Sequence, residues 1–388
     1  MPRTEPLQID TPAMRGATRD ALSLALMDAR NHSLRWFAAF ESTPAAAQAL
    51  WALGHAGWYQ EHWIARNVQR QRGERCDAGC PKLASILPEA DALFAAPTRS
   101  PLPDAQLVRQ YLVDTLETTL ELLAGAADDD DALYFYRLAL LREDSLVERY
   151  AELAQTDGID TGLLAPTPTR PAQAPLLFPA TRWMLGSARG GLVFDAEKWA
   201  HEVELPEFEI DAQAVSWAQY AEFVADGGYD DRRLWSESGW EDVQRSGRRT
   251  PRHVDQMRGG VLQMRFGKLM RVPLGLAVVH VNWHEANAWC RWAGRRLPGE
   301  AEWEAAAMLG ATRGFRWGEV REWTAGTLRP YPGAPERSAP GQAAAAASSR
   351  VLRGASFATR GRLRSAKARH GEAADADSGF FGLRSCSI

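Results

Sequence analysis

The sequence predicts an α+β protein in which a bundle of helices precedes an irregular, turn-rich C-terminal domain. Three observations support this prediction. The chain has 388 residues, which is more than one ordinary hydrophobic core accommodates, so we expect two domains. Apolar residues recur with helical spacing in the first part of the chain, whereas β-like and turn-rich sequence follows. Eleven of the fifteen tryptophans come after residue 182, and large aromatic side chains supply buried area to a domain with little regular structure.

The N-terminal part contains four segments with an amphipathic helical pattern. They share apolar residues at helical spacing, and they cover about residues 17–41, 44–71, 104–124 and 132–156. Thr43 followed by Pro44 predicts the start of the second helix, because threonine caps helices and proline fits their first turn. The acidic run at 128–131 favours the start of the fourth helix through the helix dipole. Four helices of this length predict an antiparallel bundle.

These patterns divide the chain into four parts. Residues 1–16 contain prolines and no periodicity, so we expect a disordered tail there. The helical bundle is expected over residues 17–157. Residues 158–184 contain five prolines and are interpreted as a linker, and residues 185–388 form the C-terminal domain.

The composition excludes several classes of function. The formal net charge is −4 with acids and bases well mixed, so we expect no nucleic-acid partner. No apolar run is long enough to span a membrane, and the polar N-terminal stretch is not typical of a signal peptide. The four scattered cysteines indicate free thiols in a reducing cytoplasm. Cys76 and Cys80 lack a second pair of ligands, so we interpret them as solvated loop thiols rather than a zinc site.

Five fragments of the C-terminal domain carry the most specific signal. They are VSWAQYAEFV at 215–224, HVNWHEANAWCRWAGRRLPGEAEWEAAA at 280–307, RWGEVREWTAG at 316–326, RVLRGASF at 350–357 and GFFGLRSC at 379–386. In this order they resemble the formylglycine-generating-enzyme-like (sulfatase-modifying-factor-like) domain, which implies a C-type-lectin-like fold. The first two fragments predict helices near 215–226 and 284–308, the latter broken by the Gly-Arg-Arg-Leu-Pro turn. The stretch at 353–364 lacks the two copper-binding cysteines of the formylglycine-generating enzymes, which excludes their oxidase chemistry.

The bundle together with this domain resembles the non-haem iron sulfoxide synthases of ergothioneine biosynthesis, and more closely selenoneine synthase. The fragments that carry this resemblance are ALSLALMDARNHSLRWF at 21–37, LWALGHAGWYQEHWIARNVQRQRG at 50–73, QYLVDTLETTLELL at 110–123, DDDALYFYRLAL at 129–140 and the ending LRSCSI. The resemblance implies a DinB-like four-helix bundle that supplies three histidines to Fe(II). It also implies O₂-dependent C–S or C–Se bond formation on the imidazole of a trimethylated histidine, with a selenosugar or small thiol as donor.

One of the three implied iron ligands is present in this chain. His55 matches the first ligand, whereas Arg142 and Leu146 stand where the other two histidines belong. A guanidinium stays protonated and a leucine has no lone pair, so neither can coordinate a metal. Candidate partners for a rebuilt site with His55 are His32, Glu143 and Glu148. We expect Arg142 otherwise to pair with a neighbouring carboxylate.

The resemblance also implies residues that act on the substrates. Tyr331 in RPYPGAP matches a tyrosine that donates a proton or an electron to the iron–oxygen species. Arg369 and Glu372 match the stretch that contacts the ammonium and carboxylate of the trimethylated histidine, although an amide and an aromatic residue of the family are missing here. Arg99 lies in the loop where relatives hold the carboxylate of the thiol or selenol substrate.

Two hypotheses of function follow. The first is an iron-dependent oxidoreductase of the sulfoxide or selenoxide synthase type. The second is a metal-free paralogue that binds a small molecule between its domains or acts as a partner subunit. The departures from the family lie at the implied metal and substrate positions, whereas the scaffold fragments are kept. In addition, relatives of the C-terminal domain sometimes hold Ca²⁺ near the position of Glu319 and Glu322, whose oxygens would suit that ion.

Overall fold

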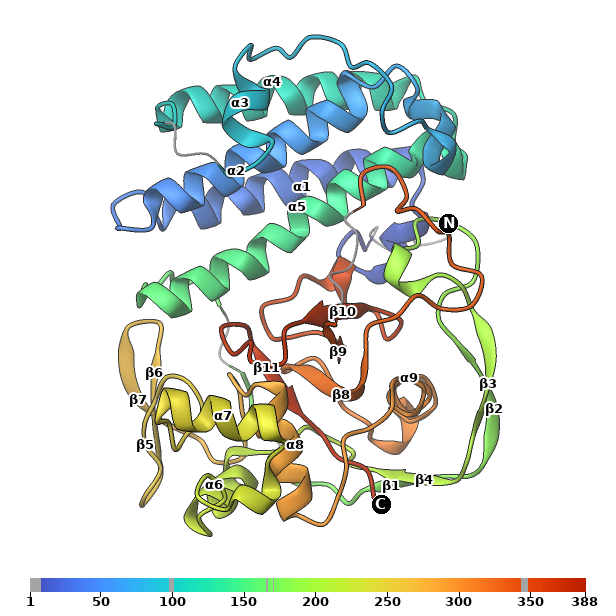
Figure 1. Cartoon of the computed structure of the whole chain (residues 1–388). Coiled ribbons are helices and arrows are strands. Elements are labelled where there is room, and N and C mark those ends of the chain that lie inside the picture. Colours follow the sequence, from blue (N-terminus) through green and yellow to red (C-terminus); the bar gives the residue numbers. More distant parts are fainter. Residues whose placement is uncertain (1–7, 98–100, 165–166, 170, 343–347) are drawn as a thin grey trace, which may run out of the picture.

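The computed structural model describes residues 8–97, 101–164, 167–169, 171–342 and 348–388. Within these ranges, long helices make up the N-terminal part, and small sheets with further helices make up the C-terminal part (Figure 1). The prediction of an α+β protein is therefore confirmed at this level. Among the described residues, no helix combines the length and the apolar character needed to cross a membrane.

Four long helices form the N-terminal part. They are α1 (Arg19–Ala38), α2 (Ala46–Gln60), α4 (Ala105–Ala124) and α5 (Asp130–Asp157). Helix α1 packs against α5, and α2 packs against both α4 and α5. Figure 1 shows α5 as the long helix that lies next to the strands of the C-terminal part. Helix α5 is therefore the surface on which the two parts of the molecule meet.

The capping residues explain where these helices start. Asp104 accepts a hydrogen bond from the backbone of Gln106 at 2.7 Å, and Asp129 accepts one from Ala132 at 2.9 Å, so both helices begin at the predicted acidic signals. The predicted cap at Thr43 is wrong. Its hydroxyl donates to the carbonyl of Phe40 at 2.8 Å and extends the end of α1 instead.

Shorter helical segments connect the long ones. They are η2 (Glu61–Ala65, a π-helical turn), η3 (Arg70–Arg75) and α3 (Ala90–Phe94) in the N-terminal part, and η4 (Asp195–Glu197), η5 (Arg232–Leu234), η6 (Ala311–Arg313) and η7 (Gly361–Leu363) in the C-terminal part. Helix α2 ends at Gln60, so the predicted extension of the second helix to Gln71 is wrong. The π-helical turn changes the spacing of side chains there and ends the regular helix.

The described part of the N-terminal tail is ordered, contrary to the expectation of disorder over residues 1–16. Residues Pro12–Gly16 form the short helix η1, in which Met14 is buried. Arg15 donates two hydrogen bonds to Glu197, at 2.6 and 3.0 Å. A buried apolar side chain and a two-point ion pair thus hold this segment against the C-terminal domain. Contacts of this kind cannot be predicted from the periodicity of the sequence.

The central sheet of the C-terminal domain has the strand order β10-β9-β8-β11. Its strands are β8 (Arg321–Thr327), β9 (Arg350–Arg353), β10 (Arg369–Glu372) and β11 (Phe381–Leu383). Strand β11 runs parallel to β8, whereas β9 is antiparallel to both of its neighbours. Because β8 and β10 both point residues toward α5, this sheet forms the second surface at which the two parts meet.

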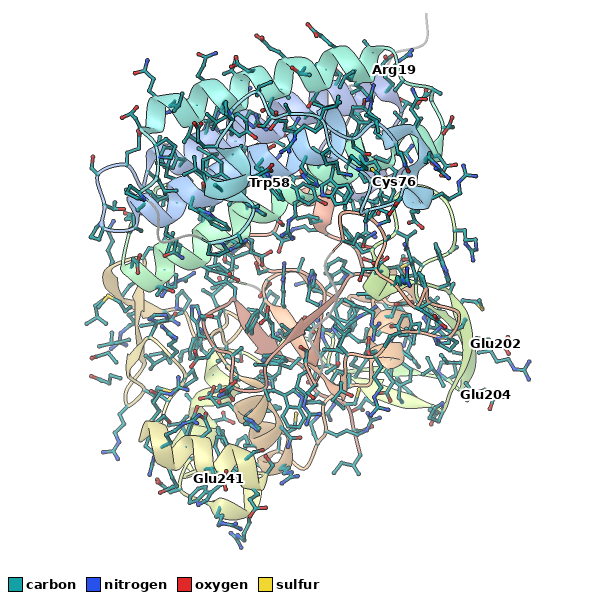
Figure 2. The ribbon with its side chains drawn as sticks, turned by 45° about the horizontal axis from the view of Figure 1, so that its top comes forward. Arg19, Trp58, Cys76, Glu202, Glu204 and Glu241 are labelled. Atoms are coloured by element: carbon teal, nitrogen blue, oxygen red, sulfur yellow. The ribbon has the colours of Figure 1, made fainter. Side chains whose placement is uncertain are left out.

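Smaller sheets and four helices surround the central sheet. The other strands are β1 (Leu176–Phe178), β2 (Thr181–Leu185), β3 (His201–Leu205), β4 (Phe208–Ile210), β5 (Val254–Gln256), β6 (Val261–Arg265) and β7 (Lys268–Val272), and the helices are α6 (Trp217–Ala225), α7 (Glu237–Ser246), α8 (Trp283–Trp292) and α9 (Glu300–Leu309). The predicted break between α8 and α9 is confirmed. Figure 2 shows Glu202 and Glu204 of β3 pointing away from the body of the molecule, as exposed edge charges do.

A cluster of buried apolar side chains continues from the bundle into the C-terminal domain. It contains Trp36 and Tyr150 from the bundle and Trp217 and Trp323 from the C-terminal domain, each at most 1% exposed. Large aromatic side chains in both parts therefore share one core, which fixes the position of α5 relative to the central sheet.

Cys76 and Cys80 are buried, which corrects their interpretation as solvated thiols. The loop that carries them folds back on itself, because Leu83 donates its backbone N–H to the carbonyl of Arg66 at 2.9 Å. Both sulfur atoms lie 3.6 Å from Oδ1 of Asn67, which is itself fully buried. Burial raises the pKa of the Cys76 thiol. The pair therefore belongs to the packing of this loop (Figure 2).

Candidate functional site

A cavity of about 500 Å³ lies between α5 and the C-terminal domain, and we call it the interdomain cleft. One wall is formed by seven residues of a single face of α5, namely Leu138, Leu141, Arg142, Ser145, Glu148, Arg149 and Glu152. Their spacing of three or four residues is that of one side of a helix. The opposite wall comes from β8, β10 and η4. The volume of the interdomain cleft is in the range of small-molecule sites.

Glu148 joins the two walls. Its carboxylate pairs with Arg321 of β8 at 2.5 Å and accepts hydrogen bonds from Ser356 at 2.6 Å and Thr359 at 2.9 Å. The side chain is almost fully buried. With these three contacts, Glu148 holds the central sheet against α5.

Arg369 forms part of the opposite wall, and its guanidinium is fully engaged. It donates to both oxygens of Glu300 at 2.5 and 2.9 Å and to the carbonyl of Ala196 at 2.5 Å. Its guanidinium carbon lies 3.8 Å from the ring centre of Tyr331. Tyr331 is buried behind Arg369 and donates to Glu300 at 3.2 Å. The two residues are thus brought together, with Arg369 at the cleft and Tyr331 beneath it.

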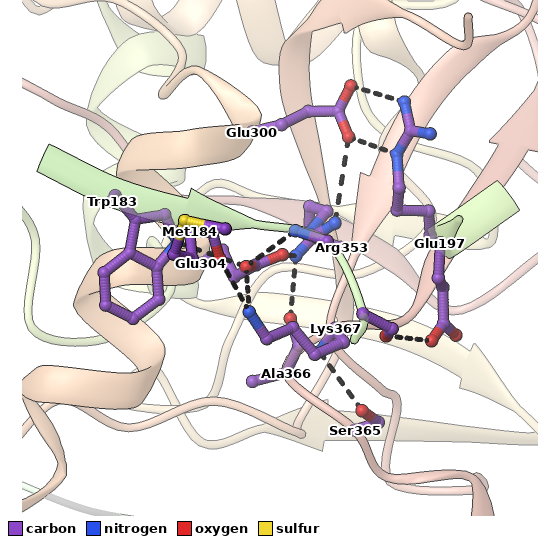
Figure 3. Close-up of polar contacts among 12 residues, drawn as sticks. Trp183, Met184, Glu197, Glu300, Glu304, Arg353, Ser365, Ala366 and Lys367 are labelled. Atoms are coloured by element: carbon purple, nitrogen blue, oxygen red, sulfur yellow. Dashed lines mark hydrogen bonds and ion pairs between the residues drawn. The ribbon is translucent and has the colours of Figure 1, made fainter. Parts of the chain in front are cut away.

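A second carboxylate of α9 braces this wall from behind. Figure 3 shows Glu304, Arg353 and Lys367 pointing toward one another. Glu304 accepts from Arg353 at 2.5 Å, from Lys367 at 2.5 Å and from the indole of Trp183 at 3.1 Å. Glu304 and Arg353 are completely buried, and a buried ion pair of this kind tolerates little displacement. The network therefore fixes α9, and with it Glu300, behind Arg369.

Four charged residues of the cleft lack an ion pair with any described residue. They are Arg142 and Arg149 of α5, Glu152 of α5 and Glu372 of β10. The expectation that Arg142 pairs with a neighbouring carboxylate is therefore wrong. Its guanidinium carbon lies 5.7 Å from the ring centre of Tyr59 instead. The cleft thus presents two cations and two carboxylates whose charges are not neutralised within the described residues.

Burial changes the proton affinity of both carboxylates. It raises the pKa of Glu152 to about 7, and the nearby charges of Glu148 and Glu372 act in the same direction. Arg321 and Arg149 oppose the shift without forming an ion pair with Glu152. Burial also raises the pKa of Glu372. Each carboxylate is therefore in an environment where a bound cation would stabilise its charged form.

His55 lies on α2, between Trp51 and Trp58, at ring-centre distances of 5.1 and 5.5 Å. Its Nδ1 is 2.7 Å from the carbonyl of Phe94, so the imidazole donates a hydrogen bond there. It does not line the interdomain cleft. Burial lowers the pKa of His55, and the positive charges of Arg142 and Arg149 lower it further.

The candidate partners of His55 are directed elsewhere. Nε2 of His32 accepts a hydrogen bond from Trp36 at 3.2 Å, and burial lowers its pKa to about 4. Glu143 is buried and accepts from Nε of Arg30 at 2.8 Å. Glu148 faces Arg321, as described above. The structure therefore does not bring His32, Glu143 and Glu148 together around His55.

The family resemblance implies Fe(II) and Ca²⁺ sites, so the side chains that could ligate these ions are compared with the contacts above. Within the described residues, no group of three or more histidine, cysteine, aspartate or glutamate side chains is placed to hold a metal ion. A ferrous site of the implied kind needs three ligands in a fixed geometry, and the side chains at 142 and 146 supply none. The residues present therefore do not fit Fe(II). They do not fit Ca²⁺ at Glu322 either, because both oxygens of this buried carboxylate accept hydrogen bonds from Arg384.

Several residues of the cleft went unnoticed in the sequence. Arg149 and Glu152 line the cavity but lie outside the quoted fragments, and Arg321 lies within the fragment at 316–326 without having been singled out. The first two could have been found by extending the face of Arg142 along its helix by seven and ten residues. Arg99, which was expected to contact a substrate carboxylate, lies outside the described residues.

Comparisons with known proteins found relatives of this chain. Residues 161–319 match the sulfatase-modifying factor enzyme 1-like domain family. The hercynine oxygenase of Mycolicibacterium smegmatis is 30% identical over 347 residues, which cover 75% of this chain and 78% of the relative. The hercynine oxygenase of Mycobacterium tuberculosis is 29% identical over 349 residues, with the same coverage of 75% and 78%.

A formylglycine-generating enzyme of Streptomyces coelicolor is 35% identical over 164 residues, which cover 39% of this chain and 52% of that enzyme. This similarity concerns a part of the chain, whereas the similarity to the hercynine oxygenases extends over three quarters of it. The chain therefore belongs to the hercynine oxygenase family, an oxidoreductase family of ergothioneine-type sulfoxide synthases that carry a formylglycine-generating-enzyme-like domain.

Proposed function

We propose that the chain binds a trimethylated histidine in the interdomain cleft, and that it does so without a resident Fe(II) centre of the three-histidine type. The pair of unneutralised carboxylates, Glu152 and Glu372, carries this proposal. We further propose that helices α1, α2, α4 and α5 form a DinB-like bundle and that the protein acts in the cytoplasm, where its four buried thiols stay reduced.

A quaternary ammonium group has no N–H to donate, so a protein recognises it through negative charge or through the face of an aromatic ring. Glu152 and Glu372 supply negative charge from opposite walls of the cleft, one from α5 and one from β10. Their raised pKa values reflect partial removal from water, which strengthens their attraction for a cation. The imidazole of the ligand would then extend along the cleft toward Tyr59.

A second candidate is an active synthase that joins sulfur or selenium to the imidazole with O₂ and non-haem iron, using a thiol or a selenosugar as donor. The extent of similarity to the hercynine oxygenases favours it. In that case His55 would be an iron ligand and Tyr331 the donor of a proton or an electron. The contact of Tyr331 with Glu300 would have to change for that role, whereas the contact of His55 Nδ1 with Phe94 leaves Nε2 free to coordinate.

Calorimetric titration with trimethylated histidine tests the first candidate. We expect saturable binding by the wild type and affinity at least about tenfold weaker for Glu152→Gln and for Glu372→Gln, because each removes one charge-assisted contact. Glu241→Gln is the matched control, since Glu241 is an exposed carboxylate of α7 away from the cleft (Figure 2). Absence of binding, or equal loss in the control, would contradict the proposal.

Metal analysis separates the two candidates. The protein is loaded anaerobically with Fe(II), dialysed and assayed for iron. We expect iron far below one ion per chain, and the same low content for His55→Ala. Near-stoichiometric iron that disappears in His55→Ala would refute the metal-free part of the proposal and support the synthase.

A further inference from the structure

We propose that Arg142 and Arg149 of α5 form a binding site for the oxyanion of a small molecule, either a carboxylate or a phosphate monoester. The site lies at the bundle side of the interdomain cleft. It is separate from Glu152 and Glu372, and it does not depend on the binding of trimethylated histidine proposed above.

The two arginines project from the same face of one helix. They are seven residues apart, which is two turns, or about 10 Å along the axis. Ser145 lies between them, also lines the cavity, and donates its hydroxyl to the backbone carbonyl of Arg142 at 2.6 Å. It therefore places no negative group between the guanidinium groups. Arginine side chains are long enough to bring their ends toward one another across this spacing.

The other arginines of the cleft are neutralised, whereas these two are not. Each of the others has a carboxylate partner, and the pairs are Arg15–Glu197, Arg321–Glu148 and Arg369–Glu300. Among the described residues, no carboxylate forms an ion pair with Arg142 or Arg149. Both side chains are exposed to solvent, and both line the cleft. Arg142 therefore borders the cleft alone, whereas Arg149 stands at the edge of the cleft and also lines a second cavity beside Trp51 and Tyr150.

Both charges lie near α2. Arg142 lies over the ring of Tyr59, which restricts its side chain and leaves its N–H groups available. The charges of both arginines act on the same imidazole of α2, that of His55. Two guanidinium charges on one helix face repel one another, and an anion bound between them would offset that repulsion.

The chemistry of the guanidinium selects the ligand. Its planar set of donors matches the two oxygens of a carboxylate or a phosphate, and such charge-assisted bonds are stronger than neutral ones. Arg149 also lies one turn from Glu152, whose carboxylate would repel an anion at that end. The oxyanion is therefore expected between Arg142 and Arg149, on the side away from Glu152.

Binding of inorganic phosphate and of acetate, each measured by calorimetry at constant ionic strength, tests the site. We expect saturable binding of at least one of them, weakened about tenfold or more in Arg142→Gln and in Arg149→Gln. Arg291→Gln is the matched control, because Arg291 is an exposed arginine of α8 without an ion pair among the described residues and outside the cleft. Circular dichroism establishes that each variant is folded.

The two probes distinguish the ligand class. Preference for phosphate indicates a phosphate monoester, and preference for acetate indicates a carboxylate. Failure of both probes to saturate, or equal weakening in Arg291→Gln, would overturn the proposal. Since neither probe contains an ammonium group, this outcome is independent of the titration with trimethylated histidine.

Discussion

Arg362 of the C-terminal domain donates two hydrogen bonds to Asp144 of α5, from Nε at 2.6 Å and from Nη2 at 2.9 Å. Both side chains are almost completely removed from solvent. Arg362 also donates to Asp28 of α1 at 2.8 Å. One guanidinium thus connects η7 with two helices of the bundle and sets the rotation of α5, on which the orientation of Arg142 and Glu152 in the cleft depends.

Removal of one partner of this pair should destabilise the protein strongly. We expect Arg362→Met to lower the free energy of unfolding by about 3 kcal/mol, because the buried Asp144 would lose its two-point partner and keep only the longer ion pair with Arg360, at 3.6 Å. The double variant Arg362→Met/Asp144→Leu should recover part of this loss. Urea unfolding measures both. Arg233→Met, at an exposed pair with Asp231, is the control and should leave stability essentially unchanged. A single variant as stable as that control would contradict the prediction.

The elevated pKa of Glu152 predicts opposite effects of pH on ligand binding and on stability. Its pKa in the folded protein is about 7, above its ordinary value, so the folded state holds the proton more tightly than the unfolded state. The contribution of Glu152 to stability therefore falls as pH rises from its ordinary pKa of 4.5 to its folded-state pKa of about 7. Affinity for a quaternary ammonium should instead rise as pH increases from about 6 to about 8, because the carboxylate becomes charged.

Glu152→Gln tests both directions. The variant should show little change in affinity between those pH values and should gain stability relative to the wild type at the higher pH. The groups that face Glu152 are Glu148, Arg149, Arg321 and Glu372, and they stay in place in this variant. A wild-type affinity that does not change with pH would show that Glu152 does not contact the ammonium group.

The cysteines should react slowly with a thiol reagent in the native protein. All four are buried, and burial raises the pKa values of Cys76, Cys290 and Cys386, which reduces the thiolate fraction at neutral pH. We expect fewer than one thiol per chain to react rapidly before denaturation and four after it. Rapid reaction of two native thiols, lost in Cys76→Ser and Cys80→Ser, would restore the interpretation of a solvated loop.

Features that depend on local chemistry could be predicted from the sequence. The starts of α4 and α5 follow from Asp104 and Asp129, whose short acidic side chains reach the free N–H groups of the next turn. The break between α8 and α9 follows from glycine and proline in one short turn. The family resemblance, in turn, rests on fragments whose order is visible without a structure.

Features that depend on contacts distant in sequence could not be predicted. Asp144 and Arg362 are 218 residues apart, and no local pattern indicates that they meet. The same holds for Arg15 and Glu197, whose pairing orders a segment that was expected to be disordered. The sequence identified Arg142 as a departure from the family. Only the positions of both walls of the cleft show that no described carboxylate forms an ion pair with it.

Restoring the two missing histidines should create a metal site if the alignment of α5 with the family is right. Positions 142 and 146 are one turn apart, and Leu146 is buried in the core cluster that also contains residues of α2. In Arg142→His/Leu146→His, two imidazoles would face the helix that carries His55. We expect this variant to bind about one Fe(II) per chain, whereas each single variant binds far less, because two ligands do not hold a labile ion well.

The same variant connects the metal question with the anion site. Iron binding should disappear again when His55→Ala is added, which distinguishes a three-ligand site from adventitious binding to surface imidazoles. Binding of phosphate or acetate should weaken as well, because Arg142 has been replaced. A folded double variant without iron would show that residues 142 and 146 do not face His55, and the alignment of α5 with the family would then be wrong.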